Sequence, residues 1–130
     1  MREILFRGKR MDNGEWITGD LVHDRRVKTN EPVLCIWYFD SDGKAQQEDV
    51  EQETVGQYTG LTDKNGKKIF EGDILELDGE DGFFEVEYDD DRAMFVTNGD
   101  YTTFYFDNLW NEVEVIGNVY DNPELMGGAE

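Results

Sequence analysis

Short apolar and aromatic segments separated by turn signals run through most of the chain, and this pattern limits what the chain can fold into. Over the second half the turns recur roughly every 8–12 residues, and helical periodicity is almost absent. The pattern predicts a mostly β fold, built as a small antiparallel barrel or sandwich. Strands are predicted over residues 3–7, 15–22, 33–39, 58–61, 67–70, 74–77, 84–89, 93–97, 101–106 and 113–120.

Three segments carry more specific expectations. Asn13-Gly14 favours a type I′ hairpin turn, in which both central residues adopt positive φ, and Asn65-Gly66 predicts a second Asn-Gly hairpin. The seven-residue apolar run 33–39 is expected to form a central strand that is buried on both faces. The polar segment 44–54 is expected to be a loop or one marginal helix.

The length of 130 residues predicts one compact domain or two very small ones. Low mean hydropathy favours disorder, but three Trp, six Tyr and eight Phe are interleaved with aliphatic residues, so we expect a folded chain with a small core. No apolar run approaches ~20 residues, so no membrane span is predicted. The opening residues do not have the pattern of a secretion signal.

Acidic residues outnumber basic ones by 31 to 12, which gives a net charge of −19. Residues 1–35 carry seven bases and six acids, so the excess of −20 lies entirely in residues 36–130. Solubility of a small domain needs a net charge of only about 2–8. The charge disfavours direct binding to nucleic acid or an anionic membrane and favours a basic partner.

The acidic residues alternate with apolar ones in two predicted strands, so their side chains are expected on one solvated face of each strand. An acidic turn follows the first of these strands. These residues form the candidate interaction face: Glu85, Glu87, Asp89, Asp90, Asp91, Glu112 and Glu114.

The residue types that carry catalysis are scarce. His23 is the only histidine and is interpreted as a surface residue, and Cys35 lies in an apolar run where burial would raise its pKa and make it inert. No phosphate-binding loop is present, and the turns 40–43 and 63–66 place their glycine too early for an EF-hand. We therefore expect no catalytic, cofactor-binding or metal-binding residues, and no enzyme.

Six basic residues near the beginning of the chain could form a nucleic-acid patch. Acids nearly balance them, and the rest of the chain repels phosphate, so the preferred interpretation is that they pair with the acidic part, within one chain or between subunits. The six are Arg7, Lys9, Arg10, Arg25, Arg26 and Lys28.

Two longer motifs resemble a known family. Residues 57–74 read QYTGLTDKNGKKIFEGDI and residues 114–125 read EVIGNVYDNPEL, after an opening REILFR at 2–7. Their order and spacing resemble the YopX family, small proteins of bacteriophages and prophages without an established activity. The resemblance implies a mostly β fold, with a β-rich region over 1–56 and an SH3-like barrel over 57–125. Residues 126–130 are expected to form a flexible tail. It also implies expression in the cytoplasm of a bacterial host, and it assigns no catalytic residues.

Three functional hypotheses follow. The first is a non-enzymatic protein that binds a basic host or phage protein, such as one that handles nucleic acid and for which the acidic face is a decoy. The second is an assembly protein that forms a homo-oligomer, because small β domains with exposed edges self-associate readily. The third, an enzyme that uses carboxylates, ranks last. A solubilising role of the charge is the competing explanation.

Overall fold

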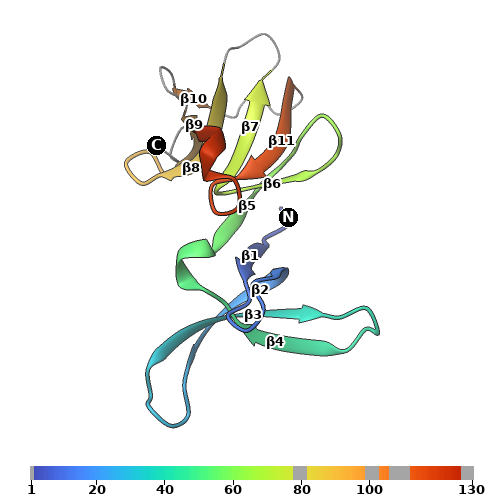
Figure 1. Ribbon diagram of the computed structural model, residues 1–130, viewed down its shortest axis with the longest axis vertical. Helices are drawn as coiled ribbons and strands as arrows, with labels where there is room; N and C mark the ends of the chain where they lie inside the picture. Colours follow the sequence, from blue (N-terminus) through green and yellow to red (C-terminus); the bar gives the residue numbers. More distant parts are fainter. Residues whose placement is uncertain (1, 78–81, 99–102, 106–111, 127–130) are drawn as a thin grey trace. The chain divides into compact units, whose positions relative to one another are not determined.

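The computed structural model describes residues 2–77, 82–98, 103–105 and 112–126, and its regular structure consists of β-strands and short 3-10 turns. The chain divides into two compact units, Met1–Tyr58 and Thr59–Glu130. The first unit contains β1 (Phe6–Lys9), β2 (Trp16–Arg25), β3 (Pro32–Phe39), β4 (Ala45–Asp49) and the 3-10 turn η1 (Gln52–Thr54) (Figure 1). The mostly β fold predicted from the sequence is confirmed.

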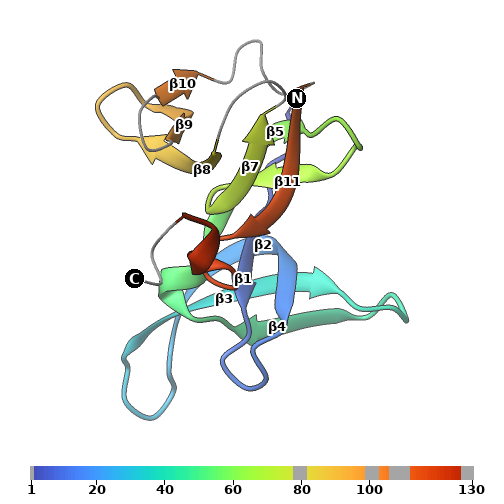
Figure 2. The same ribbon diagram turned by 45° about the horizontal axis from the view of Figure 1, so that its top comes forward.

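Strand β5 (Gly56–Thr62) crosses the boundary between the units. The second unit contains β6 (Lys68–Phe70), β7 (Asp73–Leu77), β8 (Phe83–Asp89), β9 (Met94–Asn98), β10 (Thr103–Tyr105), β11 (Val113–Asn118) and η4 (Pro123–Met126). Strands β10-β9-β8-β7-β11 form one antiparallel sheet in that order (Figure 2). The assignment of an SH3-like barrel to this region stays a prediction.

The first unit is an antiparallel sheet in the order β4-β3-β2-β1-β5. It bends back on itself, because Arg10, just after β1, bridges Val50, just after β4. Gly8 of β1 faces Val50 across this closure, and a Cβ at Gly8 would lie 3.0 Å from the Val50 side chain. A larger residue at position 8 would need the Val50 side chain to move by a few tenths of an ångström, so glycine favours this close approach of the two ends of the sheet.

Strand β2 changes partners halfway along its length. Residues 16–19 pair with β1, and residues 20–25 pair with β3. At the change, a Cβ on Gly19 would lie 2.1 Å from the carbonyl oxygen of Trp37. Any larger residue would push β3 away, so Gly19 is what allows the strand to serve both partners.

The core of the second unit lies on one face of its sheet. Alternate residues of β7, β8 and β11 point to that face, because side chains alternate between the faces of a strand. The buried cluster consists of Ile69, Leu75, Leu77, Phe84, Val86, Val113 and Val115, with Leu61 and Phe95 packed against it.

Two hairpin turns share one construction. In each, the glycine N–H donates to the carbonyl of the aspartate three residues earlier, and the glycine alone has positive φ: Asp40 with Gly43 at +78°, and Asp63 with Gly66 at +82°. This is typical of a type I turn followed by a left-handed glycine. Gly14 likewise has positive φ and Asn13 does not, so the predicted type I′ turn is wrong.

The carboxylate of Asp63 joins its turn to a distant strand. Its Oδ1 accepts hydrogen bonds from the backbone N–H groups of Asn65 and Lys67, both at 2.9 Å. Its Oδ2 accepts from the N–H of Val115 in β11, also at 2.9 Å. Burial raises the pKa of Asp63, but the three N–H donors outweigh burial, so this pKa lies below its usual value.

The strand predictions are confirmed for most segments. Two other expectations are wrong: the structure of the segment 44–54 and the burial of the strand β3. The segment 44–54 contains β4 and η1, not a loop or a helix, because residues 45–49 pair with β3. The strand β3 is not buried on both faces, since only Cys35 and Ile36 are buried and Phe39 is 63% exposed. Of the predicted strand 101–106, residues 101, 102 and 106 lie outside the described residues, as do residues 127–130 of the predicted tail.

We expect Asp63→Asn to lower the free energy of unfolding by about 1–3 kcal/mol, because one buried N–H group loses its acceptor. The pKa of Asp63 is lowered by folding, so the carboxylate stabilises the fold at neutral pH and this contribution is lost as the pH falls through the folded-state pKa. Stability of the variant should therefore fall less steeply on acidification than that of the wild type. Urea unfolding between pH 3 and 7 measures both effects.

Asp40→Asn is the matched control. Its Oδ1 accepts the same local bonds, from Asp42 and Lys44 at 2.9 Å, but Asp40 bonds no distant strand. The loss of stability should be smaller than for Asp63→Asn. Equal losses would show that the bond to Val115 contributes nothing.

Candidate acidic interaction surface

The acidic residues predicted from the sequence lie on two strands that do not pair with each other. Glu85 and Glu87 lie on β8 and Glu114 lies on β11, while β7 runs between them. All three point away from the core face, because Phe84, Val86 and Val113 occupy that face. The acidic residues of β8 and β11 can therefore form one continuous surface only if β7, which lies between these strands, also carries an acidic residue on this face.

Strand β7 supplies Glu76, which sequence reasoning missed. Glu76 stands directly opposite Glu114 on β11, and on its other side it pairs with Phe83 of β8. Glu85 pairs with Ile74 and is therefore the diagonal neighbour of Glu76. We call Glu76, Glu85, Glu87 and Glu114 the acidic sheet face. The signal in the sequence was one acid inside an otherwise apolar segment, Ile74–Leu77.

The acidic sheet face is less solvated than expected. Glu85 and Glu87 are half-buried, and Ile74 and Val96, which pair with them, are buried. Burial raises the pKa of Glu85, and the nearby carboxylate of Glu87 raises it further. The side-chain amide of Asn98 donates a hydrogen bond to Glu87.

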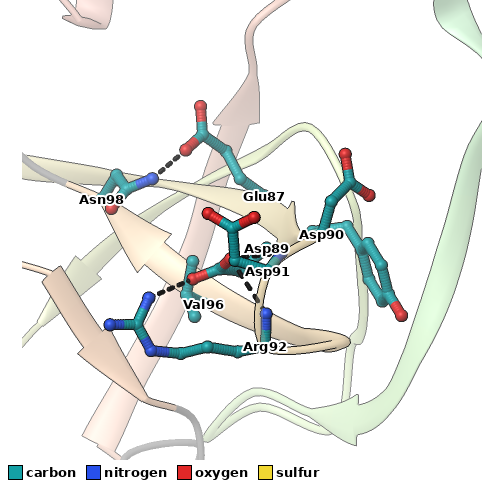
Figure 3. A pocket seen from close by; sticks show the side chains of 8 residues that line it. Glu87, Asp89, Asp90, Asp91, Arg92, Val96 and Asn98 are labelled. Carbon is teal, nitrogen blue, oxygen red and sulfur yellow. Dashed lines mark hydrogen bonds and ion pairs between the residues drawn. The ribbon is translucent and has the colours of Figure 1, made fainter.

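The turn after β8 carries the predicted residues 89–91 and borders an open pocket of about 500 Å³. Asp89 is occupied locally, because its Oδ2 pairs with the guanidinium of Arg92 at 2.8 Å and its Oδ1 accepts the N–H of Asp91 at 3.0 Å. The bond from Arg92 and these backbone bonds hold the pKa of Asp89 below its usual value. Asp90 and Asp91 are exposed. Figure 3 shows Arg92 turned toward Asp89, and Glu87 turned toward Asn98.

The last two predicted residues flank the start of β11. Glu112 is exposed just before the strand, and Glu114 is half-buried within it. The ammonium of Lys64 lies 3.7 Å from Glu114. The structure thus brings Glu114 close to Glu76 and keeps Glu85 beside Glu87, while Asp90 and Asp91 stand at the end of the β8–β9 hairpin.

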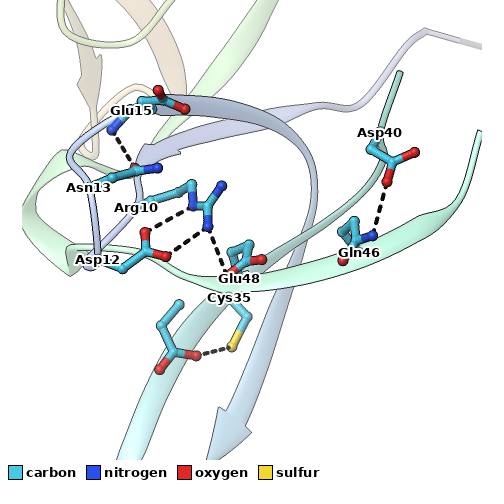
Figure 4. A network of polar contacts seen from close by, with 9 residues as sticks. Arg10, Asp12, Asn13, Glu15, Cys35, Asp40, Gln46 and Glu48 are labelled. Carbon is cyan, nitrogen blue, oxygen red and sulfur yellow. Dashed lines mark hydrogen bonds and ion pairs between the residues drawn. The ribbon is translucent and has the colours of Figure 1, made fainter. Parts of the chain in front are cut away.

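Two of the basic residues near the beginning of the chain pair with acids of their own unit. Arg10 forms a bidentate pair with Asp12 at 3.0 and 2.7 Å and lies 3.5 Å from Glu48 (Figure 4). Arg26 lies 3.2 Å from Asp49. For these two arginines, the predicted pairing with acids is confirmed within the chain.

Cys35 and His23 lie at neighbouring register positions of β3 and β2, but their side chains are on opposite faces of the sheet. Cys35 is buried, and its Sγ–H donates to Asp49 Oδ1 at 3.3 Å (Figure 4). Burial and the bond to Asp49 raise the pKa of the Cys35 thiol to about 11. His23 is exposed on β2 and pairs with Leu34 on β3. Within the described part of the chain, no three His, Cys, Asp or Glu side chains are placed to hold a metal ion.

The fold and this surface define a small, acidic, all-β protein of two units. The chain belongs to the YopX family, because the family model for YopX protein matches residues 5–127. A crystal structure of protein EF1440 from Enterococcus faecalis is similar, with a TM-score of 0.60 and 25% sequence identity over 97% of this chain and 99% of that one. No curated protein matches the chain. No helix in the described ranges is long and apolar enough to cross a bilayer.

The motifs that carry the family resemblance serve the fold. Gly72 has φ of +92°, and a Cβ there would lie 2.9 Å from the ring of Tyr120. Gly117 lies where the register of β11 shifts, and its position would bring a Cβ within 2.5 Å of Asn122 Oδ1. With Asp63, these residues hold β11 and the segment after it against β7. The residues of these motifs therefore support the strands that carry the acidic sheet face.

We expect the pKa of Glu85 to lie above its usual value, and Glu87→Gln to lower this pKa while leaving it above that value. Removing Glu87 removes the nearby charge, but the burial of Glu85, which is the larger cause, remains. NMR titration of the side-chain carboxyl carbons measures the effect. Glu112→Gln, at an exposed position, is the control and should not move the Glu85 titration.

The Cys35 thiol should not react with a disulfide reagent such as DTNB in the folded protein at pH 8. Burial blocks access, and at that pH a thiol with a pKa of about 11 is almost entirely protonated. In urea the same thiol should react completely within minutes. Fast labelling under native conditions would contradict the buried position.

Proposed function

We propose that this protein is a non-enzymatic interaction protein of phage origin, which acts in the cytoplasm of a bacterial host by binding a basic surface on a host or phage protein. The acidic sheet face and the adjacent Asp90 and Asp91 form the binding surface. The observation that carries the proposal is the register that puts Glu76 directly opposite Glu114.

Like charges that stand directly opposite in a sheet destabilise it. In the second unit, 19 acidic residues stand against four basic ones, a net charge of −15. Lys64 lies 3.7 Å from Glu114, and Arg92 pairs with Asp89, but four bases are too few to neutralise 19 acids. A partner bearing Lys or Arg side chains would supply the missing positive charge and would associate quickly at low salt.

The chemistry of the remaining side chains supports a binding role over catalysis. A thiol with a pKa of about 11 is a poor nucleophile, and His23 has no neighbouring nucleophile on its strand. Proteins that handle nucleic acid expose basic surfaces built for rows of negative charge. A host protein of this kind is the partner class that a row of carboxylates on a sheet fits best, and the protein would then act as its acidic decoy.

The test compares two variants that lose equal charge. One replaces the acidic sheet face by glutamine (E76Q, E85Q, E87Q, E114Q), and the other replaces four exposed glutamates of the first unit (E3Q, E15Q, E31Q, E53Q). Each is immobilised, exposed to lysate of a bacterial host and eluted with a salt gradient, and the bound proteins are identified by mass spectrometry.

We expect one basic protein to elute from the wild type at moderate salt, because exposed charge pairs are screened. The first variant should lose this protein, and the second should keep it. Titration calorimetry with the purified partner should then give at least a tenfold loss of affinity for the first variant. Equal retention by both variants, or binding that does not respond to salt, would refute the proposal.

A further inference from the structure

One face of β3 in the first unit carries two aromatic rings, of which one is exposed and the other half-buried. Phe39 is 63% exposed, and Trp37 lies edge-on to it with the ring centroids 4.8 Å apart. The residues paired with them in register are Asp20 on β2, opposite Trp37, and Ala45 on β4, opposite Phe39. Both neighbours are exposed. We call Asp20, Trp37, Phe39 and Ala45 the aromatic face.

The other tryptophan of the first unit has different surroundings. The guanidinium of Arg7 lies 4.7 Å from the centre of the Trp16 ring, and the ammonium of Lys9 lies 5.5 Å from it. These contacts are favourable cation–π interactions. Trp37 is instead flanked by Asp20 and Gln47, and within the part of the chain that the structure describes no cation lies over its ring or that of Phe39. An apolar surface beside an unneutralised carboxylate fits a partner that is apolar and basic.

The loop between β2 and β3 has that chemistry. Val27 is 100% exposed, and it stands between Arg26 and Lys28 and next to Arg25. The loop is ordered by backbone bonds, since Arg26 and Glu31 are joined at 2.9 Å and Asn30 donates to Arg26 at 2.8 Å. Arg26 lies 3.2 Å from Asp49, and the guanidinium of Arg25 donates to the carbonyl of Asn30 at 2.8 Å, so Lys28 is the cation of this loop that neither contact engages. We call residues 25–28 the hairpin tip.

We propose that the hairpin tip of one copy of this chain docks on the aromatic face of a second copy. Val27 would lie against Phe39, and Lys28 would lie over Trp37 and pair with Asp20. The two surfaces belong to one unit, but the strand β3 separates them: its eight residues put them ~20 Å or more apart. Figure 1 shows the loop before β3 and the turn after it at opposite ends of this strand. The hairpin tip therefore cannot reach the aromatic face of its own chain, whereas the hairpin tip of a second copy can.

The proposed contact is head-to-tail, since different surfaces of the two copies meet. Such a contact leaves one hairpin tip and one aromatic face free in every open assembly, so it continues into a closed ring or a chain of copies. It uses no residue of the acidic sheet face. The failure of this proposal would therefore leave the proposed function standing, and the reverse also holds.

The test is association in solution, measured by light scattering and sedimentation over a concentration series up to about 500 µM. We expect the wild type to self-associate, and Val27→Asp and Phe39→Ser each to weaken association at least tenfold. Both positions are exposed, so circular dichroism and thermal unfolding should show folded variants. Lys28→Glu should weaken association, and Asp20→Lys added to it should restore part of the loss. Glu76→Gln, in the second unit, is the control and should associate as the wild type does.

Mixing the two defective variants gives the sharpest outcome. The Val27→Asp copy keeps its aromatic face, and the Phe39→Ser copy keeps its hairpin tip, so an equimolar mixture should form one-to-one dimers and nothing larger. A wild type that is monomeric throughout, a mixture that stays monomeric, or self-association that neither variant weakens would each overturn the proposal. Binding of a basic peptide to the aromatic face of a monomeric wild type would assign that face to a foreign partner instead.

Discussion

The position of β11 depends on a single buried carboxylate. Asp63 closes its own hairpin turn with one oxygen and holds the N–H of Val115 with the other, 52 residues along the chain. Losing this carboxylate would leave the N–H of the buried Val115 without its acceptor. The bond from the Lys64 N–H to the carbonyl of Val113, at 3.0 Å, supports the same attachment. These contacts help to fix the register of β11 against β7, and that register sets Glu114 opposite Glu76.

The two units differ in how far basic residues neutralise their acidic ones. The first unit has eight basic and 12 acidic residues, and its arginines reach acids on neighbouring segments, as Arg10 does with Asp12 and Glu48. The second has too few bases for this, and its sheet gathers carboxylates on the face opposite the buried cluster of seven residues that the structure describes. Repulsion within that unit opposes folding and is strongest at low salt. The dense hydrogen bonding of Asp63 and the close packing at Gly72 and Gly117 are the features that offset it.

Local sequence patterns were enough to predict most strands and turns. They failed where the structure of a segment depends on the distant residues with which it pairs. Residues 45–49 have little β propensity, and they form a strand because β3 offers a free edge there. The Asn-Gly pairs marked turns correctly, but alone they did not give the turn type. At Asn65-Gly66 the carboxylate of Asp63 accepts the N–H of Asn65, a contact that lies outside the pair itself. Glu85, Glu87 and Glu114 were found by alternation. Glu76 was not, because strand order cannot be deduced from alternation within single strands.

The distinction between a functional and a merely solubilising charge lies in position. Solubility depends on net charge, and any exposed site serves it equally well. Three residues of the acidic sheet face are not at such sites, because Glu85, Glu87 and Glu114 are half-buried. The exposed Glu76 stands directly opposite Glu114, and the pKa of Glu85 is raised by burial and by Glu87. Lysine or threonine at any of them would relieve repulsion without disturbing the core. Natural proteins retain such local conflicts mainly where function requires them. A partner that supplies positive charge at these positions, as proposed above, would account for this arrangement.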